Sequence, residues 1–395
     1  MKKIVCLSII LALTVSAVFA GGKKENADTV SGASSVFDYS LSGAGAGGAS
    51  TSDAGSSSGV SGYSAVNSAI STTGTGNNGR NIPTVVIYTS MYENIIEAVK
   101  TELGKQFPQY NIVFVYGESG AIQSKIEGER GAGRLGCDIV LVAEPSYSIE
   151  LKANGMLHRY RPAEAANLAF GSDPDGYWYP VRINNMVLAY NPARNNRNAI
   201  PTSFYGFAND DRVRGAISMT NPITSGTATA AVAALLEKYG YAYYASLRSQ
   251  NIAVDTVSTA IDKLESGEYK VIMVLEESIL RRKQEQGSAL EVIYPSDGTV
   301  IIPSNIMILN EKWSANRNIQ AAESIANWFL SAAGQNVIVS GWMHSVRSNF
   351  DRLPQGARPI NEIRANSIRV NWDFVFRQRD MIRIRFEDQI INRGR

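Results

Sequence analysis

The sequence predicts an α/β fold of two lobes, each a mixed, mainly parallel sheet flanked by helices. Three observations carry this prediction. Short apolar strands alternate with helical stripes from Pro83 onward, and such alternation with short turns builds parallel sheets. The same alternation begins again after Tyr190. Further β-rich segments stand between the two series, where the chain would cross from one lobe to the other. We therefore expect a clamshell with two crossover strands as its hinge and a ligand cleft between the lobes.

The first lobe is predicted from three strands separated by two helices. Between the first two strands, Ile95, Ile96, Val99 and Leu103 recur at helical spacing and mark a buried helix face. The β-branched composition of the neighbouring runs favours strands. The expected elements are strand 84–88, helix 92–107, strand 112–116, helix 121–130 and strand 138–142.

The second lobe repeats this pattern after two short crossing strands, 177–180 and 187–190. Its expected elements are helix 228–238, helix 257–266 and strand 270–275, followed by a crossing at 300–309 and helices near 317–333 and 335–341. We assign 1–20 to a signal peptide, 21–82 to a leader, 83–184 to the first lobe, 185–302 to the second lobe, and 303–395 to a return to the first lobe with C-terminal helices.

The N-terminus has the pattern of a secretory signal peptide. Two lysines precede an apolar run, 4–20, and the small residues Val18 and Ala20 fit a cleavage site after Ala20. A membrane anchor is the alternative, but the run is short for a membrane span. No cysteine follows the run, so a lipid-attachment site is not apparent. We expect an exported, periplasmic protein.

Residues 21–82 consist mostly of Gly, Ser, Ala and Thr, with almost no apolar periodicity. Such a segment buries too little surface to offset the entropy of ordering it, so we predict a disordered leader that folding does not require. Cleavage would leave Cys137 as the one cysteine, which excludes an internal disulfide. Its apolar surroundings predict a small buried hydrophobic residue.

The composition argues against nucleic-acid binding and offers no catalytic set. The formal net charge is only +2. The two histidines, His158 and His344, lack the partner spacing of a zinc or acid–base site. A phosphate-loop motif does not occur in the sequence, and no predicted strand is followed by a Gly-x-Ser-x-Gly nucleophile elbow. We therefore predict no catalytic residue and no cofactor, with an enzyme or a structural surface protein as the alternative classes.

Hydroxyl-rich turns precede several predicted helices. In the run 220–236, Ser225, Gly226 and Thr227 would lie at a helix N-terminus, where free N–H groups and the helix dipole favour an anion. An ordinary N-cap is the alternative, since Ser and Thr are common caps. Similar turns follow the first two strands. The candidate ligand residues from these three turns are Thr89, Ser90, Ser119, Gly120, Thr224, Ser225, Gly226 and Thr227.

A set of short motifs, each weak alone, occurs in a specific order along residues 83–390. They are Val86-Ile-Tyr-Thr-Ser90, Tyr116-Gly-Glu-Ser-Gly120, Asp173-Pro-Asp-Gly-Tyr-Trp-Tyr179, Tyr190-Asn191, 221–227, Ser266-Gly-Glu-Tyr269, 294–300, Ile302-Pro-Ser304 and Val370-Asn-Trp-Asp373. With them the chain resembles the type II periplasmic solute-binding proteins of ABC importers, in the ferric-ion-binding-like branch that also takes phosphonates and sugar phosphates. The resemblance implies one small-molecule ligand, a membrane permease as partner, no nucleic acid, and a monomer.

Two ligand classes remain open. Iron-binding members of the family use a Tyr-Tyr pair where this chain has Leu275-Glu-Glu-Ser278. Iron would then depend on Tyr92, Tyr190 and Glu276 as oxygen ligands. We prefer a phosphorylated or phosphonate organic anion, because hydroxyl-rich helix starts suit an oxyanion better than a bare cation. Glu276 and Glu277 would face hydroxyls or an amine of that ligand. The simpler alternative is that both lie at a solvated helix start. Glu118 is a further candidate ligand residue.

Overall fold

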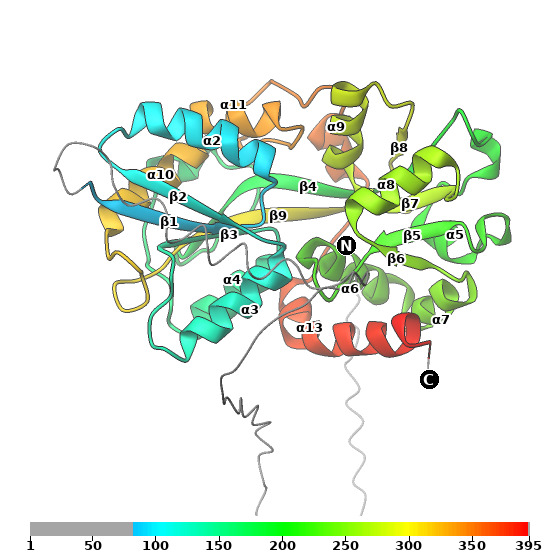
Figure 1. The fold of residues 1–395 in the computed structure, drawn as a ribbon, viewed down its shortest axis with the longest axis horizontal. Coiled ribbons are helices and arrows are strands. Elements are labelled where there is room, and N and C mark those ends of the chain that lie inside the picture. Colours follow the sequence, from blue (N-terminus) through cyan, green and yellow to red (C-terminus); the bar gives the residue numbers. More distant parts are fainter. Residues whose placement is uncertain (1–81, 394–395) are drawn as a thin grey trace, which may run out of the picture. The chain divides into compact units, whose positions relative to one another are not determined.

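The computed structural model describes residues 82–393 (Figure 1). The signal peptide and nearly all of the predicted leader lie outside the described residues and stay predictions. Among the residues that are described, no helix is long and apolar enough to cross a membrane.

The first lobe contains the predicted alternation of strands and helices. Its elements are β1 (Thr84–Thr89), α2 (Glu93–Gln106), β2 (Asn111–Tyr116), α3 (Ser119–Arg130), β3 (Ile139–Val142) and α4 (Pro145–Ala153). Ile95, Ile96, Val99 and Leu103 are the buried residues of α2, as their spacing predicts. The sequence did not predict α4, which starts at Pro145, where a proline without a free N–H is well suited to the first turn.

The crossing out of this lobe is one continuous strand, β4 (Trp178–Tyr190), rather than the two short strands predicted. It pairs antiparallel with β9 (Thr299–Ile308) from Trp178 to Met186, and then with β7 (Val271–Leu275) from Met186 to Tyr190. Polar residues in its middle interrupt the apolar pattern, but they are buried within the strand and do not form a turn. Because both crossing strands are continuous, the lobe boundaries at 184/185 and 302/303 stay predictions.

The second lobe has the same organisation. Its elements are α5 (Phe204–Asn209), β5 (Ile217–Thr220), α6 (Gly226–Tyr239), α7 (Ala242–Ser249), β6 (Ala253–Asp255), α8 (Val257–Ser266), β7, α9 (Glu276–Gln286) and β8 (Glu291–Ile293). The chain then returns through β9 to α10 (Ile319–Leu330), α11 (Ala332–Ser340), α12 (Ile360–Ala365), β10 (Ser367–Ile368) and α13 (Trp372–Phe386). Short 3₁₀ helices occupy 163–167, 197–199 and 211–213, and a short π-helix, Glu387–Ile391, follows α13.

All the main strands join in one mixed sheet with the order β2-β1-β3-β9-β4-β7-β5-β6. Three parallel strands stand at each end, and the antiparallel pair β4 and β9 connects them. The apolar core is correspondingly divided, with two clusters around β1–β3 and two around β5–β7. Cys137 is fully buried in the first lobe, as predicted.

The C-terminal helix α13 contacts both lobes, and Figure 1 shows it running beneath α6 toward α7. Val375, Ile382 and Phe386 pack into the core of the second lobe. The same helix also contacts α4 of the first lobe. It therefore connects the lobes separately from the crossing strands.

Candidate ligand-binding site

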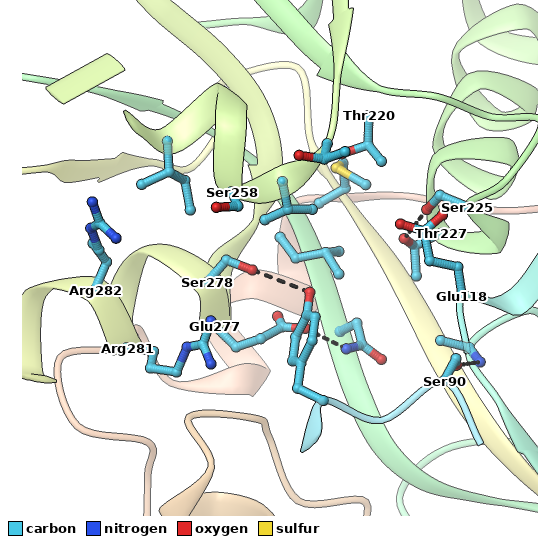
Figure 2. A pocket seen from close by; sticks show the side chains of 18 of the residues that line it. Ser90, Glu118, Thr220, Ser225, Thr227, Ser258, Glu277, Ser278, Arg281 and Arg282 are labelled. Atoms are coloured by element: carbon cyan, nitrogen blue, oxygen red, sulfur yellow. Dashed lines mark hydrogen bonds between the residues drawn. The ribbon is translucent and has the colours of Figure 1, made fainter. Parts of the chain in front are cut away.

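A cavity of about 340 Å³ lies between the lobes and receives side chains from both. Figure 2 shows Ser225, Thr227 and Glu118 on one side of it, and Glu277, Ser278 and Arg281 on another. We call Ser119, Ser225 and Thr227 the helix-start wall, because they stand at the beginnings of α3 and α6. We call Arg182, Asn184 and Glu277 the strand wall, because the first two come from β4 and Glu277 lies in the first turn of α9, directly after β7.

The helix-start wall is organised by the N-terminus of α6. Ser225 is the N-cap, and its Oγ accepts a hydrogen bond of 3.3 Å from the backbone N–H of Ala228. The same Oγ lies 3.0 Å from Thr227 Oγ1. Ser225 is thus a helix cap and also a cavity residue, so the two interpretations of the sequence are compatible. The wall presents two adjacent hydroxyls beside the positive end of a fourteen-residue helix.

The starts of α3 and α6 are in direct contact beside the cavity. The Gly120 N–H donates to the Thr224 carbonyl at 2.9 Å. A Cβ on Gly120 would lie 2.7 Å from that carbonyl oxygen, and a Cβ on Gly226 would lie 2.9 Å from Ser119 Cβ. Gly120, Thr224 and Gly226 do not line the cavity; they form a glycine seam that brings Ser119 close to Ser225.

Ser90 lines the cavity and Thr89 does not. Thr89 is fully buried, and its Oγ1 accepts from the Met91 N–H at 3.1 Å. Ser90 Oγ accepts from the Ala143 N–H at 3.2 Å, which ties the turn after β1 to the end of β3. The Ser90 hydroxyl therefore has its proton available for a ligand.

Arg182, which the sequence analysis missed, is the most unusual residue of the cavity. Its side chain is 2% exposed, and its Nε has no hydrogen-bond partner. Nη1 lies 2.8 Å from Met343 Sδ, and Nη2 donates to the Ser90 carbonyl at 3.3 Å. Burial lowers the pKa of this guanidinium from its usual value. An arginine between two apolar residues of a strand run is the sequence signal that could have identified it.

The two acidic residues after β7 have different environments. Glu277 lines the cavity and accepts from Asn184 Nδ2 at 2.5 Å, while burial raises its pKa and nearby Arg182 opposes that shift. Glu276 lies outside the cavity lining. Its carboxylate accepts from Asn185 Nδ2 at 2.6 Å and from the Tyr294 hydroxyl, and His344 Nε2 lies 2.9 Å away.

Helix α9 adds two arginines to the cavity. Arg282 forms ion pairs with Asp262 and Glu265 at 2.7 and 2.5 Å. Arg281 instead donates to the Asn94 side-chain oxygen at 3.1 Å, and its guanidinium carbon lies 5.4 Å from the centre of the Tyr92 ring. Among residues 82–393, neither Arg182 nor Arg281 forms an ion pair within 4.0 Å. Two cationic groups of the cavity are therefore not neutralised by a direct carboxylate contact.

The two candidate iron ligands among the tyrosines are separated. Tyr92 lines the cavity, with its hydroxyl 3.3 Å from Ser278 Oγ, and burial raises its pKa to about 12. Tyr190 packs into the core of the second lobe, with Arg197 over its ring, and is not part of the lining. Within the described part of the chain, no group of three or more His, Cys, Asp or Glu side chains could hold a metal ion.

Solved structures with the same fold are numerous. The periplasmic binding protein AfuA from Actinobacillus pleuropneumoniae, with fructose-6-phosphate bound, is 20% identical, with a TM-score of 0.68 over 78% of this chain and 98% of that one. Iron-bound HitA from Pseudomonas aeruginosa is 19% identical, with a TM-score of 0.67 over 77% and 99%. A periplasmic thiamin binding protein is 17% identical, with a TM-score of 0.67 over 79% and 98%. These similarities confirm the predicted two-lobed fold.

The sequence comparison identifies the family. No curated protein sequence matches the chain significantly. Residues 137–376 match the family of bacterial extracellular solute-binding proteins, and this match covers more than half of the chain. The resemblance inferred from the sequence motifs is confirmed: the chain belongs to the bacterial extracellular solute-binding proteins, which bind a solute for transport and do not transform it.

Proposed function

We propose that this protein captures a small organic anion with a phosphate or phosphonate head in the cavity between its lobes and delivers it to the permease of an ABC importer. The observation that carries the anion assignment is Arg182, a buried guanidinium in the cavity wall with an unpartnered Nε. Removing a cation from water without a counter-charge is costly, so buried cations are normally paired. Glu277 is a nearby carboxylate but forms no direct ion pair with Arg182, so an anionic ligand would supply a direct partner.

The helix-start wall supports a phosphate rather than a simple carboxylate. A phosphate head offers three terminal oxygens, and the wall offers hydroxyls of Ser225 and Thr227, with Ser119 from the other lobe. The N-termini of α3 and α6 both favour negative charge at this place. Arg281 adds a second cation without a direct carboxylate partner, which suits a dianion.

The remainder of the cavity supports a hydroxyl-bearing body on the ligand. Glu277, Asn184 and Ser278 form a polar surface beside Arg182, and Glu118 lies near the helix-start wall. Carboxylate oxygens accept hydrogen bonds from sugar-type hydroxyls. The fructose-6-phosphate bound to AfuA has both parts, although that similarity by itself establishes only the fold.

Ferric iron is the second candidate, because HitA of the same fold binds iron. Its oxygen ligands would be Tyr92, Tyr190 and Glu276. Tyr190 and Glu276 lie outside the cavity lining, and the pKa of about 12 makes the Tyr92 phenolate costly at neutral pH. These placements favour the organic anion.

The permease assignment rests on the family and the fold. A substrate-binding protein of an ABC transporter from Agrobacterium tumefaciens is 15% identical, with a TM-score of 0.65. We infer that the mature protein is periplasmic and acts as a monomer. The sequence predicts that removal of the signal peptide after Ala20 produces this mature chain.

A ligand panel tests this proposal. The chain without residues 1–20 would be analysed by native mass spectrometry and thermal melting with fructose 6-phosphate, fructose, inorganic phosphate, thiamin and ferric citrate. We expect fructose 6-phosphate to raise the melting temperature and fructose to leave it unchanged, because fructose lacks the anion. Stabilisation by ferric citrate alone, with a coloured complex, would replace the proposal by the iron alternative. Stabilisation by thiamin alone would contradict both.

A further inference from the structure

We propose that Arg383, on the C-terminal helix α13, is a positioning residue that holds the helix starts of the two lobes together behind the cavity. The inference rests on the proposed function only in assuming that these helix starts hold the ligand. Arg383 itself does not line the cavity.

The guanidinium of Arg383 contacts both lobes. In the second lobe, Nε lies 3.2 Å from the Pro222 carbonyl oxygen and 3.3 Å from Thr229 Oγ1. In the first lobe, Nη1 donates to Gln123 Oε1 and Nη2 to Glu144 Oε2, each at 3.3 Å. One planar cation with several fixed donors therefore joins the two lobes, a role that lysine with a single ammonium group would not reproduce.

Two of the residues that Arg383 contacts lie directly behind side chains that face the cavity. Gln123 is one helical turn after Ser119 on α3, and Thr229 is one turn after Ser225 on α6. Gln123 Nε2 also donates to Glu144 Oε2 at 2.5 Å. A shift of Arg383 would thus be transmitted through one turn of each helix to the hydroxyls that face the cavity.

The glycine seam leaves little freedom for these helix starts to move independently. A Cβ on Gly226 would lie 2.6 Å from Glu144 Oε2 and 2.9 Å from Ser119 Cβ. The Gly120 N–H spans the seam to the Thr224 carbonyl. The spacing between Ser119 and Ser225 is therefore set by close backbone packing, and Arg383 closes the rear of the same junction.

The charges at this junction explain why an arginine is required there. Glu144 is fully buried, and its counter-charges come from α13: Arg383 at 3.3 Å and Arg379 at 3.7 Å. Arg379 also pairs with Glu150 at 2.5 Å. The apolar face of α13 is fixed in the core of the second lobe. The helix therefore reaches from the second lobe to a buried carboxylate of the first.

Hydrogen exchange of the ligand-free protein tests the positioning role without any assumed ligand. Arg383→Gln would be compared with Arg377→Gln, an exposed arginine of the same helix that makes no hydrogen bond or ion pair within the described residues. We expect peptides covering 117–124 and 221–229 to exchange at least about tenfold faster in Arg383→Gln, because the Gly120–Thr224 bond loses its support. Unchanged exchange in both peptides would overturn the proposal.

Binding of fructose 6-phosphate then separates positioning from simple stabilisation. Arg383→Gln should weaken binding by about tenfold. The double variant Glu144→Gln/Arg383→Gln should regain melting temperature, because it removes a buried carboxylate left with Arg379 at 3.7 Å as its counter-charge. Affinity should stay low in the double variant, since neither glutamine spans both lobes. Recovery of affinity together with melting temperature would show a structural role alone. If the unaltered chain does not bind fructose 6-phosphate but the exchange result holds, the ligand proposal fails and the positioning role stands.

Discussion

The two walls of the cavity obtain their polar groups in different ways. The helix-start wall uses hydroxyls that also cap and pack local structure, so Ser225 contributes to folding and to the cavity. The strand wall instead holds a buried guanidinium without a carboxylate partner, which folding alone does not favour. A polar side chain whose burial destabilises the fold is therefore a stronger indication of ligand binding than a polar side chain with a structural role.

The largest effect is expected from Arg182→Met. Binding of fructose 6-phosphate should weaken by about 2–4 kcal/mol, because a buried charged contact is lost. The free energy of unfolding should stay the same or rise, since the cost of burying a cation without a direct ion pair outweighs its attraction to nearby Glu277. Calorimetric titration and chemical denaturation measure the two quantities.

The control for this variant is Arg377→Met, at an exposed position on α13. Unchanged affinity in Arg182→Met would show that the strand wall does not contact the anion. A fall in both affinity and stability would mean that Arg182 supports the fold, and the contrast between the walls would disappear.

The next largest loss of ligand affinity is expected from variants of the helix-start wall. Ser225→Ala combined with Thr227→Ala should weaken binding by roughly 1–3 kcal/mol in total, through lost hydrogen bonds to a charged group. Unlike Arg182→Met, this pair should also lower the free energy of unfolding by about 1 kcal/mol, because the N-cap of α6 is removed.

Ser203→Ala is the matched control, because Ser203 caps α5 by accepting from the Gly206 N–H at 2.9 Å and does not line the cavity. It should lose stability without losing affinity. If the Ser225 and Thr227 variant behaves in the same way in titrations, the turn before α6 is only a cap.

The helix-start wall could be predicted from sequence because its signals are local. A Ser-Gly-Thr step before an apolar helical run shows both the cap and the helix direction. The alternation of β1, α2, β2, α3 and β3 was predicted for the same reason. That these turns meet across the lobes is not a local signal. The parallel strands of the two lobes run in opposite directions, and both groups end toward the middle of the long strands β4 and β9.

Within the strand wall, Glu277 was predicted as a ligand residue, but Arg182 and Asn184 could not be, because their positions depend on the register of β4 against β9 and β7. The polar residues of 182–185 interrupt an apolar run, and this pattern is also typical of a turn. Tyr190, proposed as a metal ligand by resemblance, comes eight residues after Arg182 on this strand. At about 3.3 Å per residue, the two are separated by roughly 26 Å along the strand.

The two neighbouring glutamates at the start of α9 give a smaller contrast, because Glu277 lines the cavity and Glu276 does not. Glu277→Gln should weaken binding of fructose 6-phosphate about three- to tenfold through a weaker hydroxyl contact, but it should not weaken binding of inorganic phosphate. Glu276→Gln should instead lower the free energy of unfolding by about 1–3 kcal/mol, because its carboxylate accepts buried donors outside the cavity. A fall in phosphate affinity for Glu277→Gln would indicate that this residue holds the anion site itself.

The smallest effect is expected from the tyrosines, and it tests the ligand class. Tyr92→Phe should change the affinity for fructose 6-phosphate less than about threefold, since its hydroxyl contacts Ser278 and one neutral hydrogen bond contributes little. Tyr190→Phe should have no effect, because Tyr190 lies outside the cavity lining. If the ligand is ferric iron instead, the tyrosine variants should have the largest effects on affinity. A ferric–phenolate bond requires loss of a proton whose pKa is about 12 in the metal-free protein, so iron affinity would fall as the pH is lowered. A charge-transfer band with ferric citrate that disappears in Tyr92→Phe would therefore replace the anion by iron.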